Sequence, residues 1–225
     1  MNYNVDSDGI ATVEWDLPGR SQNVMNDDSI KAWVEAMDKA IADPAVSGIL
    51  VTSAKKDFIA GGDLEMLLKM QSAGEVFEWS KRFHAACRRI ETSGKPVACA
   101  MPGSALGGGL EIAMVCHYRV ASDNPKARFG LPEATLGLLP GGGGTQRLPR
   151  LIGYAAAIPM MTEGRKIKSD AALKQGILHA VVPAGTERDA ARAWLRSDAG
   201  KTAKQPWDTK GSKIPGGGLA TPNGM

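Results

Sequence analysis

Three consecutive glycines, Gly107 to Gly109, stand between two apolar stretches, and they constrain the fold more than any other feature of this sequence. The run from Pro96 to Met101 has the length of a buried strand, and the run from Leu110 to Cys116 has the pattern of a helix. Glycine has no Cβ, so another molecule can approach the backbone here, and the first N–H groups of a helix have no internal partner. The stretch therefore offers amide donors, with the carboxylate of Glu111 about one turn further along. It indicates either a turn that stabilises an oxyanion or a tight turn whose glycines serve packing alone.

Composition places the chain among globular proteins and excludes several classes of function. The 225 residues, 43% hydrophobic and 23% charged, suffice for one domain, with or without a tail. The net charge of +3 is too small to indicate a nucleic acid or an acidic membrane surface as partner. No apolar run approaches the ~18 residues of a membrane span, and the N-terminus has no signal or transit pattern. We therefore expect a cytoplasmic protein without a membrane span.

Cysteine and histidine usage agrees with that expectation. The three cysteines lie in apolar surroundings and form no C-x-x-C pair, which predicts buried free thiols in a reducing compartment. The three histidines are scattered along the chain, so we expect no metal site.

Hydrophobic periodicity predicts strands that alternate with helices. A hairpin is expected at residues 2–16, and strands at 47–52, 96–101, 118–122, 127–130 and 178–182. Helices are expected at 30–41, from 63, at 76–90, 110–116, 145–152, 155–162 and 169–175. This alternation predicts parallel strands joined by right-handed crossovers, an α/β layered fold. Beyond about Thr202, lysine, proline and glycine dominate, which is typical of a linker or tail rather than of core.

Three segments combine a strand end, a glycine loop and a helix start. They are residues 58–64 (F-I-A-G-G-D-L), residues 107–111 (G-G-G-L-E), and residues 129–133 (F-G-L-P-E) with the following run 137–148 (G-L-L-P-G-G-G-G-T-Q-R-L). Two such loops at neighbouring strand ends can aim two backbone N–H groups at one oxygen, at the edge where ligands bind in open α/β sheets. Glu111 and Glu133 can then divide acid and base roles between them.

These motifs, in this order, resemble the enoyl-CoA hydratase/isomerase (crotonase) family over roughly residues 1–190. The resemblance implies an α/β fold built as a spiral of repeated ββα units, assembled as trimers or dimers of trimers. It implies a coenzyme A thioester as substrate, no separate cofactor, and a thioester carbonyl held by the N–H groups of Gly62 and Gly108. The presence of both Glu111 and Glu133 as catalytic residues favours the addition of water to a 2-enoyl-CoA, the hydration step of fatty-acid β-oxidation.

The same resemblance implies positions for substrate contacts. Gly141 would help to hold the reacting water. The coenzyme A groove would be lined by Phe58, Ala60, Asp63, Leu64 and Glu65, with Lys56 as a phosphate contact.

The C-terminal residues carry a second resemblance. Residues 205–208 (Q-P-W-D) and 214–218 (I-P-G-G-G) look like the connector of bacterial multifunctional fatty-acid oxidation proteins, in which a hydratase domain precedes a dehydrogenase. We therefore expect a hydratase domain at 1–195 with incomplete C-terminal helices, a connector at 196–225, and association with a thiolase subunit in a full-length bacterial protein. One departure is that 22 positions separate the two glutamates, slightly more than in short hydratases.

Other interpretations remain beside the hydratase. The chain could be a Δ3-Δ2-enoyl-CoA isomerase, or a non-catalytic homologue that binds coenzyme A or RNA. A serine hydrolase built on Ser104 is disfavoured, because the local sequence G-S-A-L-G is not G-x-S-x-G. The glycines at 141–144 lack the Lys-Ser/Thr pair that follows in a phosphate-binding P-loop.

Overall fold

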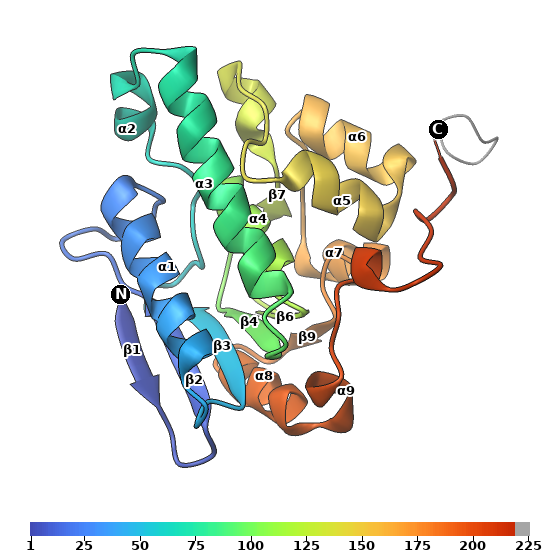
Figure 1. The fold of residues 1–225 in the computed structure, drawn as a ribbon. Helices are drawn as coiled ribbons and strands as arrows, with labels where there is room; N and C mark the ends of the chain where they lie inside the picture. Colours follow the sequence, from blue (N-terminus) through green and yellow to red (C-terminus); the bar gives the residue numbers. More distant parts are fainter. Residues whose placement is uncertain (219–225) are drawn as a thin grey trace.

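A six-stranded sheet forms the centre of the molecule in the computed structural model, which describes residues 1–218. Its strand order is β1-β2-β3-β4-β6-β9 (Figure 1). The strands are β1 (Asn2–Val5), β2 (Ile10–Trp15), β3 (Gly48–Ser53), β4 (Val97–Met101), β6 (Tyr118–Ser122) and β9 (Ala180–Val182). The β1–β2 hairpin is antiparallel and every later pairing is parallel, so both the predicted hairpin and the predicted parallel sheet are confirmed.

Both faces of this sheet are buried, which explains why its middle strands are apolar without alternation. In β3, Ile49 and Val51 belong to a large core on one face, whereas Leu50 belongs to a smaller core on the other. The large core is closed by α1 (Asp27–Ala42), α3 (Ala73–Glu91) and α4 (Gly108–Val115). The smaller core is closed by α8 (Glu187–Arg196), which lies on the side of the sheet opposite to α1, α3 and α4 (Figure 1).

Sequence signals set the ends of the helices that cover the large core. Asn26 caps α1 by accepting a hydrogen bond from the backbone of Ser29, and Pro44 follows the end of this helix. Ser72 caps α3 in the same manner. The short helix α2 (Leu64–Lys69) begins at Asp63, whose side chain accepts from the backbone N–H of Glu65.

A second sheet of two-residue strands lies beside the first and holds the glycine turns. It contains β5 (Ala105–Leu106), β7 (Phe129–Gly130) and β8 (Lys166–Ile167), and the 3-10 helix η1 (Pro132–Leu136) follows β7. Three helices complete this part: α5 (Gly144–Ile152), α6 (Tyr154–Thr162) and α7 (Ser169–Gln175). Strands as short as β5 and β8 carry no periodicity, so the sequence did not reveal them.

The C-terminal residues pack more closely on the body than their composition indicates. After α8 come α9 (Asp198–Lys201) and the 3-10 helix η2 (Pro206–Asp208). Gln205 is fully buried, and its side-chain amide donates 2.8 Å to the carbonyl oxygen of Val115 at the end of α4. Part of the segment predicted to be linker or tail rather than core therefore contacts the core through one buried polar side chain. Its role as a connector stays a prediction, and the part of that segment at 219–225 lies outside the described residues.

No helix within residues 1–218 combines the length and the apolar character needed to cross a membrane.

Candidate active site

Glu111 lies in the first turn of α4, where the glycine run begins the helix. Gly107 caps this helix with a φ of +52°, which a residue with a Cβ rarely adopts. The Glu111 side chain is buried, and its Oε1 accepts a hydrogen bond of 2.7 Å from the backbone N–H of Gly144. The loop at residues 141–144 therefore holds the carboxylate of Glu111, whose helix begins at the glycines 107–109.

Close packing shows how tightly that second loop surrounds Glu111. A Cβ on Gly142 would lie 2.5 Å from Oε2 of Glu111, and a Cβ on Gly144 would lie 2.9 Å from Oε1. Real Cβ atoms do not approach this closely, so neither position accepts a side chain without movement. The glycines at 142 and 144 are required by the approach of the carboxylate.

Glu133 reaches the same place from η1. A Cβ on Gly107 would lie 2.8 Å from Oε1 of Glu133, so the second carboxylate rests against the residue that caps the Glu111 helix. Its Oε2 is buried and has no hydrogen-bond partner among the described residues. The structure therefore brings together the two glutamates that the sequence singled out. It also leaves Oε2 of Glu133 able to accept a hydrogen bond.

Burial shifts the protonation of both glutamates. Removal from water raises the pKa of Glu111 to about 7, the nearby Glu133 carboxylate adds to this rise, and hydrogen bonds from Gly144 and Gly142 partly oppose it. Burial also raises the pKa of Glu133. At neutral pH the Glu111 carboxyl can therefore both give and accept a proton.

Two backbone N–H groups that have no acceptor within residues 1–218 lie close to each other. Met25 accepts from the N–H of Asp63 and donates to the carbonyl of Gly61, so the N–H of Gly62 between them points to the opposite side. The Gly108 backbone is close by, since a Cβ there would lie 3.8 Å from the nitrogen of Gly62. No acceptor within residues 1–218 takes the N–H of either Gly62 or Gly108. Their placement fits the predicted pair of donors for one oxygen.

Comparison with known proteins identifies the family. The family model for enoyl-CoA hydratase/isomerase matches residues 6–205. The chain belongs to the enoyl-CoA hydratase/isomerase family. A fatty acid oxidation complex subunit alpha of Shewanella sp. (strain W3-18-1) is 44% identical over 184 residues, which are 81% of this chain and 26% of that protein. The chain thus spans about a quarter of the length of the curated relatives it matches.

Solved structures of the family agree with the fold. An enoyl-CoA hydratase from Geobacillus kaustophilus superimposes with a TM-score of 0.79 and 31% identity, covering 85% of this chain and 71% of that one. An enoyl-CoA hydratase from Bacillus anthracis gives a TM-score of 0.77 and 29% identity, covering 86% of this chain and 74% of that one. The predicted crotonase-like α/β fold is confirmed.

The residues predicted for the coenzyme A groove fall into two groups. Lys56, Leu64 and Glu65 are exposed, and Ala60 is half-buried on the same segment. Asp63 is buried as the cap of α2 and pairs with Arg20 at 3.3 Å. Phe58 is fully buried among the apolar side chains of the core, so its aromatic ring is not available to a ligand and its position does not support a groove contact.

A cleft of about 990 Å³ begins beside these residues. It lies between the start of α1, α2 and α3, and charged side chains of both signs line it. Its lining includes Arg20, Asp27, Asp63, Glu65, Trp79 and Arg82. Asp63, the residue that follows Gly62, is part of this lining.

Sequence reasoning missed three side chains that support the loops of the site. Asn23 is buried, and its amide donates to the carbonyl of Phe58 and to the hydroxyl of Ser53. The thioether of Met25 packs against Gly108, where an added Cβ would lie 2.3 Å from the sulfur. His84 in α3 lies 2.7 Å from the carbonyl oxygen of Gly141. Nothing in the sequence marked these residues, because each contacts loop backbone far away in the chain.

Within the described residues, no three histidine, cysteine or acidic side chains are placed to hold a metal ion.

Proposed function

We propose that this chain is an enoyl-CoA hydratase that adds water across the double bond of a trans-2-enoyl-CoA thioester, as in fatty-acid β-oxidation. The observation that carries the proposal is the convergence of two buried carboxylates, Glu111 and Glu133, close to the backbone of Gly62 and Gly108, whose N–H groups meet no acceptor within residues 1–218. Membership of the family and the likeness to solved enoyl-CoA hydratases of Geobacillus and Bacillus support it.

The two amides would act on the thioester carbonyl. When the oxygen of water bonds to C3, the electrons of the C2=C3 bond move toward C2 and the carbonyl, and negative charge develops on the thioester oxygen. Donors fixed before the reaction stabilise that charge without reorganising. The donors at Gly62 and Gly108 are backbone N–H groups, so this stabilisation does not depend on any titratable side chain.

The two glutamates would move the protons. We assign Glu133 as the principal acid and base, which accepts a proton from the attacking water and delivers a proton to C2, so that water is added in total. Glu111, fixed by Gly144, would hold the water and assist, with the neighbouring Gly141 as a further contact. The pKa of about 7 for Glu111 supports such exchange near neutral pH, and the upward shift of the Glu133 pKa is in the same direction.

Partners and substrate contacts belong to the same proposal. The exposed residues Lys56, Leu64 and Glu65, with Ala60 and Asp63, would contact the coenzyme A part, and no further cofactor is proposed. The Shewanella relatives are named as subunits of a fatty acid oxidation complex, which supports a bacterial setting and association with another subunit. We propose that this subunit is a thiolase and that the setting is the cytoplasm. A homotrimer or hexamer is the expected assembly.

Hydration of crotonyl-CoA, followed as loss of the enoyl absorbance, tests the proposal. We expect turnover by the wild-type chain and none by the double variant Glu111→Gln/Glu133→Gln, with circular dichroism to show that both are folded. A folded wild-type chain that hydrates no 2-enoyl-CoA of any length but binds acyl-CoA would contradict the hydratase and favour a binding protein. Conversion of 3-enoyl-CoA without hydration would favour an isomerase.

A further inference from the structure

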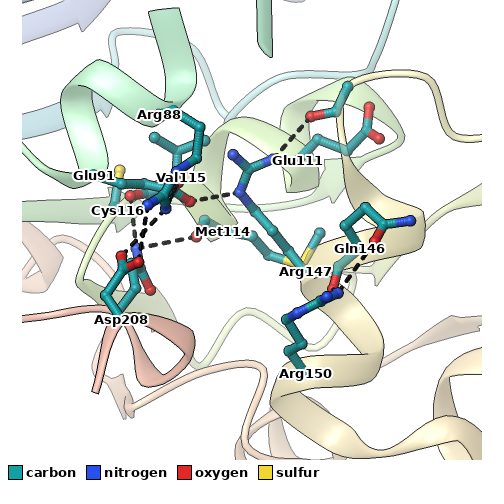
Figure 2. A network of polar contacts seen from close by, with 12 residues as sticks. Arg88, Glu91, Glu111, Met114, Val115, Cys116, Gln146, Arg147, Arg150 and Asp208 are labelled. Atoms are coloured by element: carbon teal, nitrogen blue, oxygen red, sulfur yellow. Dashed lines mark hydrogen bonds and ion pairs between the residues drawn. The ribbon is translucent and has the colours of Figure 1, made fainter. Parts of the chain in front are cut away.

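Arg147 in α5 is a buried arginine that contacts the loop around Glu111. Its Nη1 donates to the carbonyl oxygen of Gly142 at 3.2 Å, and its Nε donates to Oε1 of Glu91 at 2.6 Å. A Cβ on Gly143 would lie 2.1 Å from Nη1 of Arg147, so the guanidinium packs directly against this loop. Figure 2 shows Arg147 between Glu91 on one side and Glu111 on the other.

Glu91 fixes that guanidinium from the end of α3. Its side chain is fully buried, and its second oxygen accepts from Arg88 at 2.5 Å. Arg88 also donates to Asp208 in η2 at 2.8 Å, so the network continues into the C-terminal segment (Figure 2). The chain of contacts runs from Asp208 through Arg88, Glu91 and Arg147 to the backbone that holds Glu111.

The energetics of this network favour a positional role. Taking a carboxylate and a guanidinium out of water costs several kcal/mol per ion, and a buried pair often contributes no net stability compared with apolar residues of the same volume. What such a pair provides is a fixed geometry, because the planar guanidinium donates in two set directions at once. Here one direction is used by Glu91 and the other by Gly142.

We propose that Arg147 is a positioning residue for Glu111: it fixes the Gly142–Gly144 loop around that carboxylate, and Glu91 fixes Arg147. The inference rests on the proposed function, because it concerns the carboxylate that would hold water. The charged and titratable groups that interact with Glu111 are Glu133 from η1, Arg147 from α5 and Cys87 from α3. Among these, Arg147 is the cation, and its charge lowers the pKa of Glu111 against the effects of burial and of Glu133.

Two variants and one matched control test the proposal. Arg147→Lys keeps the charge but loses the fork, and Arg147→Met/Glu91→Gln removes both charges together so that neither is left buried without its partner. Arg150→Lys is the control, because Arg150 lies on the same helix, is exposed, and contacts only Gln146 in the network of Figure 2. We expect both Arg147 variants to lose between about ten- and a hundredfold in kcat for crotonyl-CoA, with KM nearly unchanged. The control should keep the wild-type values.

A second readout separates positioning from a structural role and does not require turnover. The pKa of Glu111, followed by the carboxyl carbon chemical shift in labelled protein, should rise in Arg147→Met/Glu91→Gln and stay unchanged in Arg150→Lys. Unchanged kcat and an unchanged Glu111 pKa in folded Arg147 variants would overturn the proposal. A wild-type chain without hydratase activity would refute the proposed function instead, while a shifted Glu111 pKa in the same samples would still support the positioning.

Discussion

The backbone N–H of Gly144 and the carboxylate of Glu111 are joined by a hydrogen bond of 2.7 Å, although 33 positions separate the two residues in the chain. This contact joins the start of α5 to the start of α4, and it holds the glycine loop at 141–144 next to the glycine turn at 107–109. A carboxylate held in this way is buried yet fixed in direction, which is what the positioning of a water molecule requires.

The roles of the two glutamates can be separated by amide substitution. Glu133→Gln and Glu111→Gln each keep size and part of the hydrogen bonding but remove the titratable proton. We expect each variant to lose at least about a hundredfold in kcat, because general acid–base catalysis typically contributes 10²–10⁴-fold. Binding of acyl-CoA should change little, since the proposed thioester contacts are backbone amides.

Steady-state kinetics with crotonyl-CoA and calorimetric binding of a saturated acyl-CoA measure the two effects. Glu163→Gln, which alters an exposed carboxylate outside the lining of the cleft, serves as the control. If both catalytic variants retain near-normal turnover, the assignment of the pair is wrong.

Burial of Glu111 has a consequence for stability that depends on pH. Its pKa is about 7 in the folded chain against 4.5 in a model peptide, so folding favours the protonated form. The stability that this group contributes is fully present below pH 4.5, and it is lost as the pH rises through about 7. Glu111→Gln cannot ionise, so we expect it to be more stable than wild type at pH 8 by up to about 3 kcal/mol.

Urea unfolding at several pH values measures this difference. The advantage of Glu111→Gln should shrink toward zero as the pH falls to 4.5. A variant that is less stable than wild type at pH 8 would mean that the ionised carboxylate is well satisfied by its backbone donors.

The proposed oxyanion donors are best tested at Gly62. At Gly108 an added Cβ would strike the sulfur of Met25 at 2.3 Å, so any substitution there also disturbs packing. At Gly62 the nearest atom to an added Cβ is the Cδ1 of Leu67 at 3.5 Å, an ordinary contact. Gly62→Pro removes the N–H, and Gly62→Ala retains it.

We expect Gly62→Pro to lose about a hundredfold or more in kcat, which corresponds to roughly 3 kcal/mol of transition-state stabilisation. Gly62→Ala should remain within a few-fold of wild type, and thermal melts should show that both variants are folded. Equal activity of the two variants would remove Gly62 from the set of donors.

Much of this architecture was predictable because the signals are local. Asn26 and Ser72 are capping residues at the starts of α1 and α3, and Pro44 follows the end of α1. The three segments with glycine loops predict which parts of the chain converge, and the structure places Glu111 and Glu133 together.

What remained hidden depends on contacts between distant residues. The sequence patterns do not predict helix α8, in which five of the ten residues are charged, although Ala191 and Leu195 help to cover the second face of the sheet. Phe58 was assigned to the groove, whereas its ring belongs to the core. The partners of Arg147 lie in two other segments, and no spacing rule connects them.

The C-terminal segment shows the same limit and supplies the last prediction. Gln205 stands in a stretch rich in lysine, proline and glycine, and yet it is fully buried and donates to the carbonyl oxygens of Met114 and Val115 at the end of α4. Carbonyls at a helix C-terminus have no partner within the helix, so this amide satisfies groups that are otherwise costly to bury. We therefore expect Gln205→Ala to lower the free energy of unfolding by about 1–3 kcal/mol.

The neighbouring Lys204 is exposed, so Lys204→Ala is the matched control and should change stability by less than about 0.5 kcal/mol. Urea denaturation of both variants gives the comparison. Because Gln205 contacts the last turn of the helix that carries Glu111, a loss at Gln205 alone would show that residues after α9 support the site's framework. Equal stability of the two variants would show instead that the segment does not pack in solution, as expected for a connector.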